Sequence, residues 1–435
     1  MIEKIIRFWT IRELRNKVLV TLFLLAIVRI LIFIPLPLIQ TTAISRLFDQ
    51  NAFLGFLNIF SGGGLENFSI TTMGVGPYIT ASIIMQLLGI IVPQIEELQN
   101  EGEYGQRKIN QYTRYLTFPL GIIQAYGVLI LLRQNGVVAT WTPTTLAVTL
   151  LMMTAGTLFV MWLGEIITER GIGNGISLII TLGILGALPL SIQNLITTVQ
   201  TSGSYTMLIS LAVITILSIV FVIIINEAKR LVPVAYARWL RSGGSFGSVP
   251  SHLPIKVNTA GVVPIIFAIA MLTIPVFLGQ FFTQARTAWL ANAANWLVQT
   301  FQPNTTAYNV IYFVLVFAFT FFYTNVLFTQ QNYGENLKRV GAQIPGVSRG
   351  AATQRYLNRV LSRITLPGAL FLGVVAIMPW LISLIIPQFG STRSSSFFLI
   401  SSAGLLIVVG VVRDTFFNIQ AELKLHGYDD ALLIR

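Results

Sequence analysis

The sequence contains no cysteine and only two histidines, His252 and His426. Without cysteine, the chain has no disulfide, no thiol nucleophile and no thiolate ligand for a metal. Two histidines far apart in the sequence are also a poor basis for a zinc site, because such sites need three or four protein ligands. We therefore expect no redox centre, no metal and no other cofactor.

Charged residues are scarce as well, at 10% of the 435 residues, whereas 54% of the residues are hydrophobic. A soluble protein averages about 25% charged residues, so this chain has too few to cover a globule in water. The apolar residues are gathered into stretches of about 20 residues, the length of a helix that crosses a bilayer. We predict an all-α polytopic membrane protein with spans at 18–36, 71–92, 115–132, 144–164, 176–197, 206–225, 258–280, 308–328, 364–387 and 396–412.

Lysine and arginine are unevenly distributed among the segments that connect these spans. With the N-terminus in the cytoplasm, 23 of the 28 basic residues fall on the cytoplasmic side, as the positive-inside rule predicts. Both termini are then cytoplasmic, and most of these charges are explained by topology and by attraction to anionic lipids. Two basic cytoplasmic segments, 227–257 and 330–363, are longer than connectors need to be, and we predict that they form a docking surface for a large partner.

A short motif occurs twice. The segments 74–81 (GVGPYITA) and 261–268 (GVVPIIFA) share Gly, Val, Pro, Ile and Ala at a constant offset of 187 residues. They lie in the second and seventh predicted spans, so we predict two five-helix halves of opposite topology, 1–200 and 201–435. Gly and Pro that interrupt corresponding spans indicate a central pathway between the halves. Secondary transporters and flippases are also built in this way, so a transporter remains an alternative.

The segment 53–69 (FLGFLNIFSGGGLENFS) mixes aromatic residues with three consecutive glycines. It is too polar to cross hydrocarbon and too apolar for a solvated loop. Irregular backbone at membrane depth is tolerated inside protein or against water. A re-entrant or pore-inserted segment fits best, and the alternative is an ordinary amphipathic turn outside the membrane.

The predicted spans contain essentially no acidic residue, and Arg29 is the one clear charge within them. Ion-coupled transporters usually carry intramembrane acids. A narrow aliphatic constriction blocks ions by dewetting, which suits a channel that passes polypeptides. Arg29 has either a structural or lipid-related role or a role in the pathway.

Sequence motifs of common enzymes are absent. The chain has no G-x-x-x-x-G-K-[ST], no H-E-x-x-H and no G-x-S-x-G, which argues against a P-loop ATPase, a zinc protease and an α/β-hydrolase. The glycines of 171–175 (GIGNG) lack the spacing of a nucleotide-binding loop and join two predicted spans. We expect no catalytic residues.

An ordered set of longer motifs runs through nearly the whole chain. It consists of Arg29 with FIPLP at 33–37, NIFSGG at 58–63, GPYITASIIMQLL at 76–88, NQYTRY at 110–115, GE at 164–165 with ITERGIGNGIS at 167–177, LPIKVN at 253–258 leading to Gly261 and Pro264, and LLIVV at 405–409. In these motifs the chain resembles the SecY family, the central channel subunits of the bacterial Sec translocon.

The resemblance implies ten helices in two inverted halves around an hourglass pore closed by a plug, with a lateral gate between the second and third spans and the seventh and eighth. By position, the implied pore ring is Ile79, Ile83, Ile180, Ile266 and Ile407. The implied plug spans about 56–69 and includes Phe56, Asn58, Ile59, Phe60, Ser61, Gly62 and Gly63.

The resemblance also implies a function and partners. Such a channel translocates unfolded polypeptides across the bacterial cytoplasmic membrane and releases membrane helices laterally. Its partners are the small subunits SecE and SecG, the SecA ATPase, the ribosome, signal sequences and nascent polypeptides. The docking residues would be Arg238, Arg241, Lys256, Lys338, Arg339, Arg349, Arg355 and Arg359.

This chain departs from the family in both docking segments. The basic pair that usually precedes the His-Leu-Pro-Ile-Lys stretch is missing from 241–247 (RSGGSFG). The family pattern Pro-Gly-Ile-Arg-Pro-Gly reads PGVSRG at 345–350, so Arg349 is displaced by one residue. Lys338, Arg339, Arg355 and Arg359 are candidates to take over part of its role.

Overall fold

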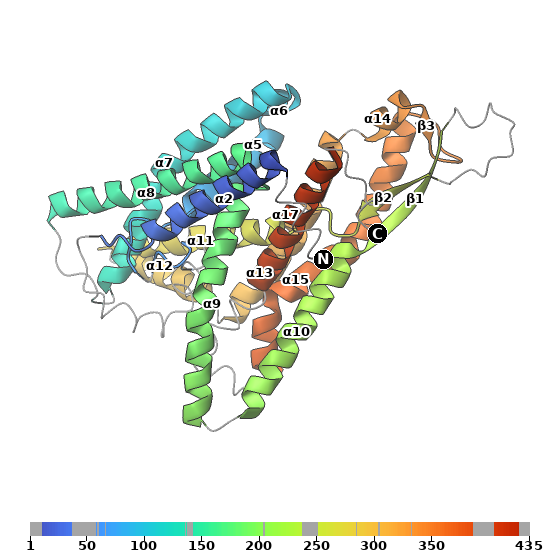
Figure 1. Cartoon of the computed structure of the whole chain (residues 1–435). Helices are drawn as coiled ribbons and strands as arrows, with labels where there is room; N and C mark the ends of the chain where they lie inside the picture. The colour runs from blue at the N-terminus through green and yellow to red at the C-terminus, as the bar shows by residue number, and fades with distance from the viewer. Residues whose placement is uncertain are drawn as a thin grey trace, which may run out of the picture. The chain divides into compact units, whose positions relative to one another are not determined.

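The computed structural model describes residues 11–36, 58, 61–65, 67–134, 136, 142–202, 205–236, 251–283, 285–302, 305–331, 333–385 and 404–425. This part of the chain is mainly helical (Figure 1). The helices are α2 (Arg12–Leu31), α5 (Gly76–Ile91), α6 (Pro93–Asn100), α7 (Glu103–Gln134), α8 (Pro143–Arg170), α9 (Gly175–Ser202), α10 (Tyr205–Glu227), α11 (Val263–Phe282), α12 (Ala288–Thr300), α13 (Thr306–Gln330), α14 (Tyr333–Arg339), α15 (Ala351–Ile385) and α17 (Leu405–Leu425). The strands are β1 (Lys229–Tyr236), β2 (Ser251–Lys256) and β3 (Ala342–Gln343).

A helix lies at the position of each of the ten predicted spans. Among the residues that the structure describes, five helices are long and apolar enough to cross a membrane, or six if α5 and α6 count as one bent span. The bend between α5 and α6 is 107° and falls at Val92, whose extended backbone is the conformation favoured before a proline. A helical protein with several membrane spans is thus confirmed, and the count of ten crossings stays a prediction.

Two helices begin well before the predicted spans. α7 starts at Glu103 and α15 at Ala351, so much of the predicted connecting segments is helical. In α7 the added turns are stabilised by polar pairs one turn apart, such as Arg107 with Glu103 at 2.7 Å. Hydropathy marks the part of a helix that suits the bilayer, and it does not mark where a polar extension begins.

The chain forms two compact units. The first lies within Met1–Ala212, Ala270–Tyr308 and Pro379–Arg435. In this unit α7 packs against α5 and α8, α9 packs against α8 and α17, and α2 contacts α8 and α9 (Figure 1). Its core joins Leu65 and Phe68 of the glycine-rich segment to side chains of α7, α8 and α11, including Leu129, Met153 and Phe277.

The second unit lies within Val213–Ile269 and Asn309–Met378. It contains a three-stranded antiparallel sheet in the order β2-β1-β3, with Lys229 opposite Lys256 and Ala235 opposite Gln343. Strands β1 and β2 come from the first predicted docking segment and β3 from the second. The two segments are therefore parts of one folded structure, whose core includes Val232, Ile255, Ile344, Leu357 and Leu361.

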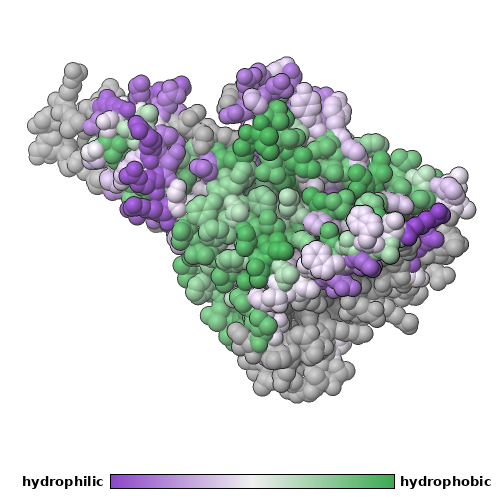
Figure 2. Space-filling model, turned by 180° about the vertical axis from the view of Figure 1, so that it is seen from behind, coloured by the Kyte–Doolittle hydropathy of each residue, from purple (hydrophilic) through white to green (hydrophobic). Residues whose placement is uncertain are grey.

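The surface agrees with a membrane environment. Figure 2 shows a face that is largely hydrophobic, with hydrophilic residues gathered into patches. Large apolar side chains that protrude from predicted spans include Phe23, Ile91 and Ile216, exposed by 67%, 74% and 61%. Such side chains are stable in contact with lipid and unfavourable in water.

The repeated motif has the same backbone form in both places. Gly74 and Gly261 both have a positive φ, 52° and 64°, a conformation that favours glycine. In each copy a helix starts two residues later, α5 at Gly76 and α11 at Val263. The motif therefore marks the start of each helix and does not interrupt it, unlike our expectation. The inverted halves themselves stay a prediction.

Candidate functional site

The five isoleucines of the predicted pore ring are all buried. Their exposed fractions are 7% or less. Ile79 and Ile83 lie one turn apart on the same side of α5, whereas Ile180 lies on α9, Ile266 on α11 and Ile407 on α17. Four of the five belong to the first unit, and Ile266 belongs to the second.

Burial separates these isoleucines from lipid-facing ones. An isoleucine in a membrane helix most often contacts lipid or packs in a core, and in this structure the lipid-facing type is exposed, as at Ile90 and Ile91. Near Ile407, a Cβ added to Gly404 at the start of α17 would lie 3.3 Å from Ile184 of α9. The pore-ring residues of these two helices thus lie on closely packed elements.

The described part of the predicted plug is a compact turn structure. Ser61 Oγ accepts a hydrogen bond from the Leu65 N–H at 2.9 Å and donates to the Asn58 carbonyl at 3.0 Å. Gly62 and Gly63 have positive φ values of 69° and 93°, and a Cβ on Gly64 would lie 2.7 Å from the Thr71 carbonyl oxygen. The three consecutive glycines are explained by this backbone. Phe56, Ile59 and Phe60 lie outside the described residues.

The segment returns to the end of α2. The Leu36 N–H donates to the Phe68 carbonyl at 2.9 Å, and the Ile70 N–H donates to the Ile34 carbonyl at 3.1 Å. An isolated antiparallel bridge between Pro35 and Ser69 lies between these bonds. The backbone of the FIPLP motif therefore pairs with the residues that follow the glycines.

Arg29 contacts this turn directly. It lies in the last turn of α2, and its Nη1 donates to the Gly62 carbonyl at 3.1 Å. Its Nη2 donates to the Gly186 carbonyl of α9 at 3.3 Å. The one charge of the predicted spans thus joins two helices to the glycine-rich segment.

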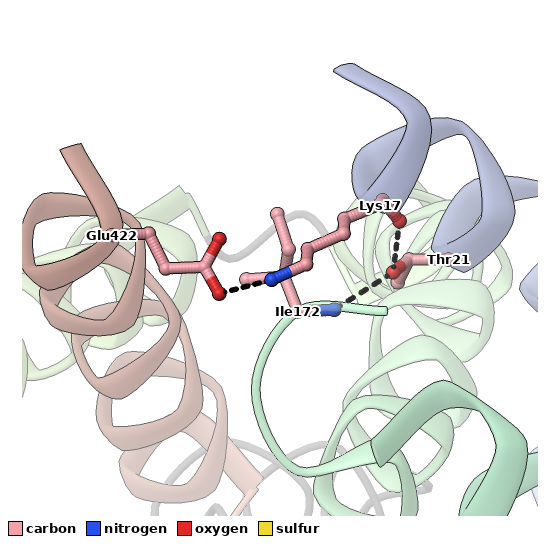
Figure 3. A network of polar contacts seen from close by, with 4 residues as sticks. All are labelled: Lys17, Thr21, Ile172 and Glu422. Atoms are coloured by element: carbon pink, nitrogen blue, oxygen red, sulfur yellow. Dashed lines mark hydrogen bonds and ion pairs between the residues drawn. The ribbon is translucent and has the colours of Figure 1, made fainter. Parts of the chain in front are cut away.

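The GIGNG motif forms the turn between α8 and α9, so it joins two helices as predicted. Its Ile172 N–H donates to Thr21 Oγ1 of α2 at 3.1 Å, and Thr21 Oγ1 donates to the Lys17 carbonyl at 2.8 Å (Figure 3). Lys17 Nζ lies 2.5 Å from Glu422 Oε1 of α17. A Cβ at Gly171 would clash with Thr21 Oγ1, so the turn depends on glycine to approach α2.

The predicted docking residues are carried by the second unit. Lys338, Arg339, Arg349, Arg355 and Arg359 are exposed, and Lys256 is half-buried on β2. Arg238 and Arg241 lie outside the described residues. The exposed set lies on α14, on the turn after β3 and on the first turns of α15, next in sequence to the core that holds the sheet.

Arg349 follows a defined turn. The Val347 N–H donates to the Ile344 carbonyl at 3.1 Å across Pro345 and Gly346, and Gly346 has a φ of 77°. Proline followed by a glycine with positive φ is typical of a type II turn. Arg349 itself donates through Nε to Gln343 Oε1 of β3 at 3.0 Å, so the displaced arginine is oriented by the sheet.

Two polar pairs of the first unit were not predicted. Arg114 of α7 contacts Glu165 of α8 through two nitrogens, at 2.9 Å and 2.7 Å. Gln124 of α7 donates to Thr80 of α5 at 3.2 Å in a buried position. Arg114 and Glu165 lie in the motifs NQYTRY and GE. Their place in these motifs was the feature of the sequence that could have pointed to them. Among the described residues, no group of three or more His, Asp or Glu could hold a metal ion.

Comparisons with known proteins cover almost the whole chain. A family model described as SecY matches residues 69–416. "Protein translocase subunit SecY" of Halalkalibacterium halodurans is 40% identical over 98% of this chain and 99% of its own length. "The structure of a protein conducting channel" matches with a TM-score of 0.62 at 17% identity over 92% of each chain. Sec61 in the canine ribosome-channel complex from the endoplasmic reticulum matches with a TM-score of 0.62 at 16% identity, over 94% of this chain and 92% of that one.

Proposed function

This chain belongs to the SecY family, and from that membership we propose that it forms the protein-conducting channel of a Sec translocon. The observation that carries the proposal is 40% identity over nearly the full length of a SecY translocase subunit. Unfolded polypeptides cross through the chain, and sufficiently apolar segments leave sideways into lipid. Family membership favours this channel over the transporter or flippase alternative.

The proposed channel has ten spans in two inverted halves, 1–200 and 201–435, with the pore ring formed by Ile79, Ile83, Ile180, Ile266 and Ile407. The burial of all five side chains supports this assignment. A ring of aliphatic side chains excludes ions because a narrow apolar constriction dewets. The same side chains carry no charge that would hold a passing polypeptide.

The proposed plug is the segment of about 56–69, including Phe56, Ile59 and Phe60 together with the described residues Asn58, Ser61, Gly62 and Gly63. Its compact hydrogen-bonded turn supports this role, because a plug needs a fixed shape in the closed channel. Burial of Leu65 and Phe68 in the core supports a plug that is anchored at these two residues.

The channel is passive and is driven by a partner, either the SecA ATPase or the ribosome. We assign the docking surface to the basic residues of the second unit, where exposed arginine and lysine side chains are supported by the β2-β1-β3 sheet. SecE and SecG, signal sequences, nascent polypeptides and anionic lipids complete the proposed set of partners. The chain lies in the bacterial cytoplasmic membrane with both termini in the cytoplasm.

Substitution within the ring tests the pore. We expect Ile266→Asn and Ile407→Asn each to increase ion conductance of the idle channel several-fold and to permit secretion of substrates with defective signal sequences, because a polar side chain wets the constriction. Conductance is measured in planar bilayers, and secretion in cells that carry the variant.

Ile265→Asn is the matched control, since Ile265 is the neighbouring residue on α11 and is fully buried. It should reduce stability without either pore effect. Unchanged conductance and unchanged secretion in both ring variants would show that these isoleucines do not form the constriction.

A further inference from the structure

Arg29 is in an unusual position for a charged side chain. It lies in the last turn of α2 within a predicted span, where a charge is costly unless it is paired. Its two described partners are backbone carbonyls, Gly62 in the glycine-rich segment and Gly186 on α9. Neither partner is an acid, so the contact can be broken without leaving a second charge in the membrane.

The surroundings of the guanidinium are built from glycine. A Cβ added at Gly186 would lie 2.5 Å from both Nη atoms of Arg29 and 2.6 Å from its Cζ. A Cβ at Gly62 would meet Gly183 of α9 and Ile32, the residue that follows α2, both at 3.5 Å. The guanidinium therefore occupies a slot that any larger residue at Gly186 would fill.

The carbonyl on α9 lies beside a proline. Pro189 is inside α9 and has no N–H to donate to the Leu185 carbonyl. One backbone hydrogen bond of α9 is therefore missing, at the Leu185 carbonyl next to Gly186. Arg29 donates to the backbone at a point where the helix itself is weakened.

We propose that Arg29 is the latch of the plug. Its guanidinium is fixed on α9 by the Gly186 carbonyl and holds the Gly62 carbonyl, so that the glycine-rich segment stays in its closed position. Opening then requires the Gly62 contact to break, while Gly186 retains the charge. Arg29 is a positioning residue that acts on the closed state and does not contact the translocating chain.

This inference rests on the proposed function, because it needs the segment to be a plug. A hydrogen bond to a charged group changes an equilibrium by about tenfold or more. We therefore expect Arg29→Gln to shift the idle channel toward the open state by about tenfold and to raise its ion conductance accordingly. Arg29→Lys, which keeps the charge but loses the fork of donors, should give a smaller increase.

Gly186→Ala provides a second variant that leaves Arg29 itself intact. The added Cβ displaces the guanidinium from its slot, so conductance should rise as in Arg29→Gln. Arg286→Gln serves as the control, since Arg286 is exposed and precedes α12, and its conductance should equal that of the wild type. All variants are measured as the complete purified complex in planar bilayers, after thermal unfolding has shown that the complex is assembled.

A double variant separates this inference from the plug assignment. In a channel that lacks residues 56–63, Arg29→Gln should add nothing to the conductance, because the contact at Gly62 is already gone. If the deletion raises conductance and neither Arg29→Gln nor Gly186→Ala does so, the latch is wrong and the plug stands. If the deletion itself has no effect, the plug assignment fails. An increase of the same size in the presence and absence of 56–63 would place the effect of Arg29 elsewhere.

Discussion

Along the N-terminal half of α2, residues from three separate parts of the chain are joined by two interactions of different kinds (Figure 3). Thr21 accepts the Ile172 N–H in a buried hydrogen bond. Lys17 and Glu422 form an ion pair, and their side chains keep 30% and 31% of their surface exposed. Solvent weakens an ion pair of this kind, whereas a buried N–H without a partner is costly. The neutral bond should therefore contribute more to stability than the ion pair.

Single substitutions test which of the two interactions contributes more to stability. We expect Thr21→Val to lower the free energy of unfolding by about 1–3 kcal/mol, because the Ile172 N–H loses its acceptor. Lys17→Met should cost no more than about 1 kcal/mol, with Glu422→Gln as its matched partner. Thermal unfolding of the purified complex measures all three. A larger loss for Lys17→Met than for Thr21→Val would show that the charges dominate.

Single residues could be predicted from the sequence by their residue type or as members of a motif, but their partners could not. Arg114 and Glu165 were both within quoted motifs, but their pairing across 51 positions depends on how α7 packs against α8. Arg29 was recognised as an isolated charge, yet its partners are backbone carbonyls that no residue type identifies. A residue type reveals which chemistry is present, and the fold decides which atoms meet.

At the scale of elements, hydropathy located all ten predicted helices but not their ends. α7 and α15 continue into polar segments, where helix stability comes from side-chain pairs and from packing. The glycine-rich segment was recognised as irregular. The segment divides into a turn and a following part that is anchored by Leu65 and Phe68. This division depends on burial in the folded protein, which composition does not reveal.

This division predicts different outcomes for two deletions. Removal of 56–63 should raise the ion conductance of the idle channel several-fold and lower stability only by the lost acceptor of the Leu65 N–H, about 1–3 kcal/mol, because the core residues remain. Removal of 56–69 should raise conductance and also destabilise the complex, since burial of Leu65 and of Phe68 contributes about 1.5–3 kcal/mol each. Planar-bilayer conductance and thermal unfolding report the two effects.

The comparison of the two deletions is its own control. Equal stability of both deleted chains would mean that Leu65 and Phe68 are not anchors. Unchanged conductance in both would mean that the segment does not close the channel.

At the scale of the whole molecule, the sequence predicted two separate basic segments, and the structure joins them in one sheet. Strand β1 pairs with β2 of its own segment and with β3 of the other. Pairing between segments so far apart in the chain is set by folding and leaves little trace in local composition. We therefore expect the proposed docking residues on α14, on the turn after β3 and on α15 to act as one surface, so that charges removed from different parts of it affect the same partner.

Charge reversal tests that surface. We expect Arg349→Glu together with Arg355→Glu to weaken binding of SecA or the ribosome by at least tenfold, mainly through slower association. Both side chains are exposed, so substitution should leave folding nearly unchanged. The loss should shrink as salt is raised, because screening already removes the attraction in the wild type.

Arg133→Glu, at the end of α7 and outside both segments, is the control and should bind as the wild type does. Full binding by the double variant at physiological salt would remove this surface from the interface.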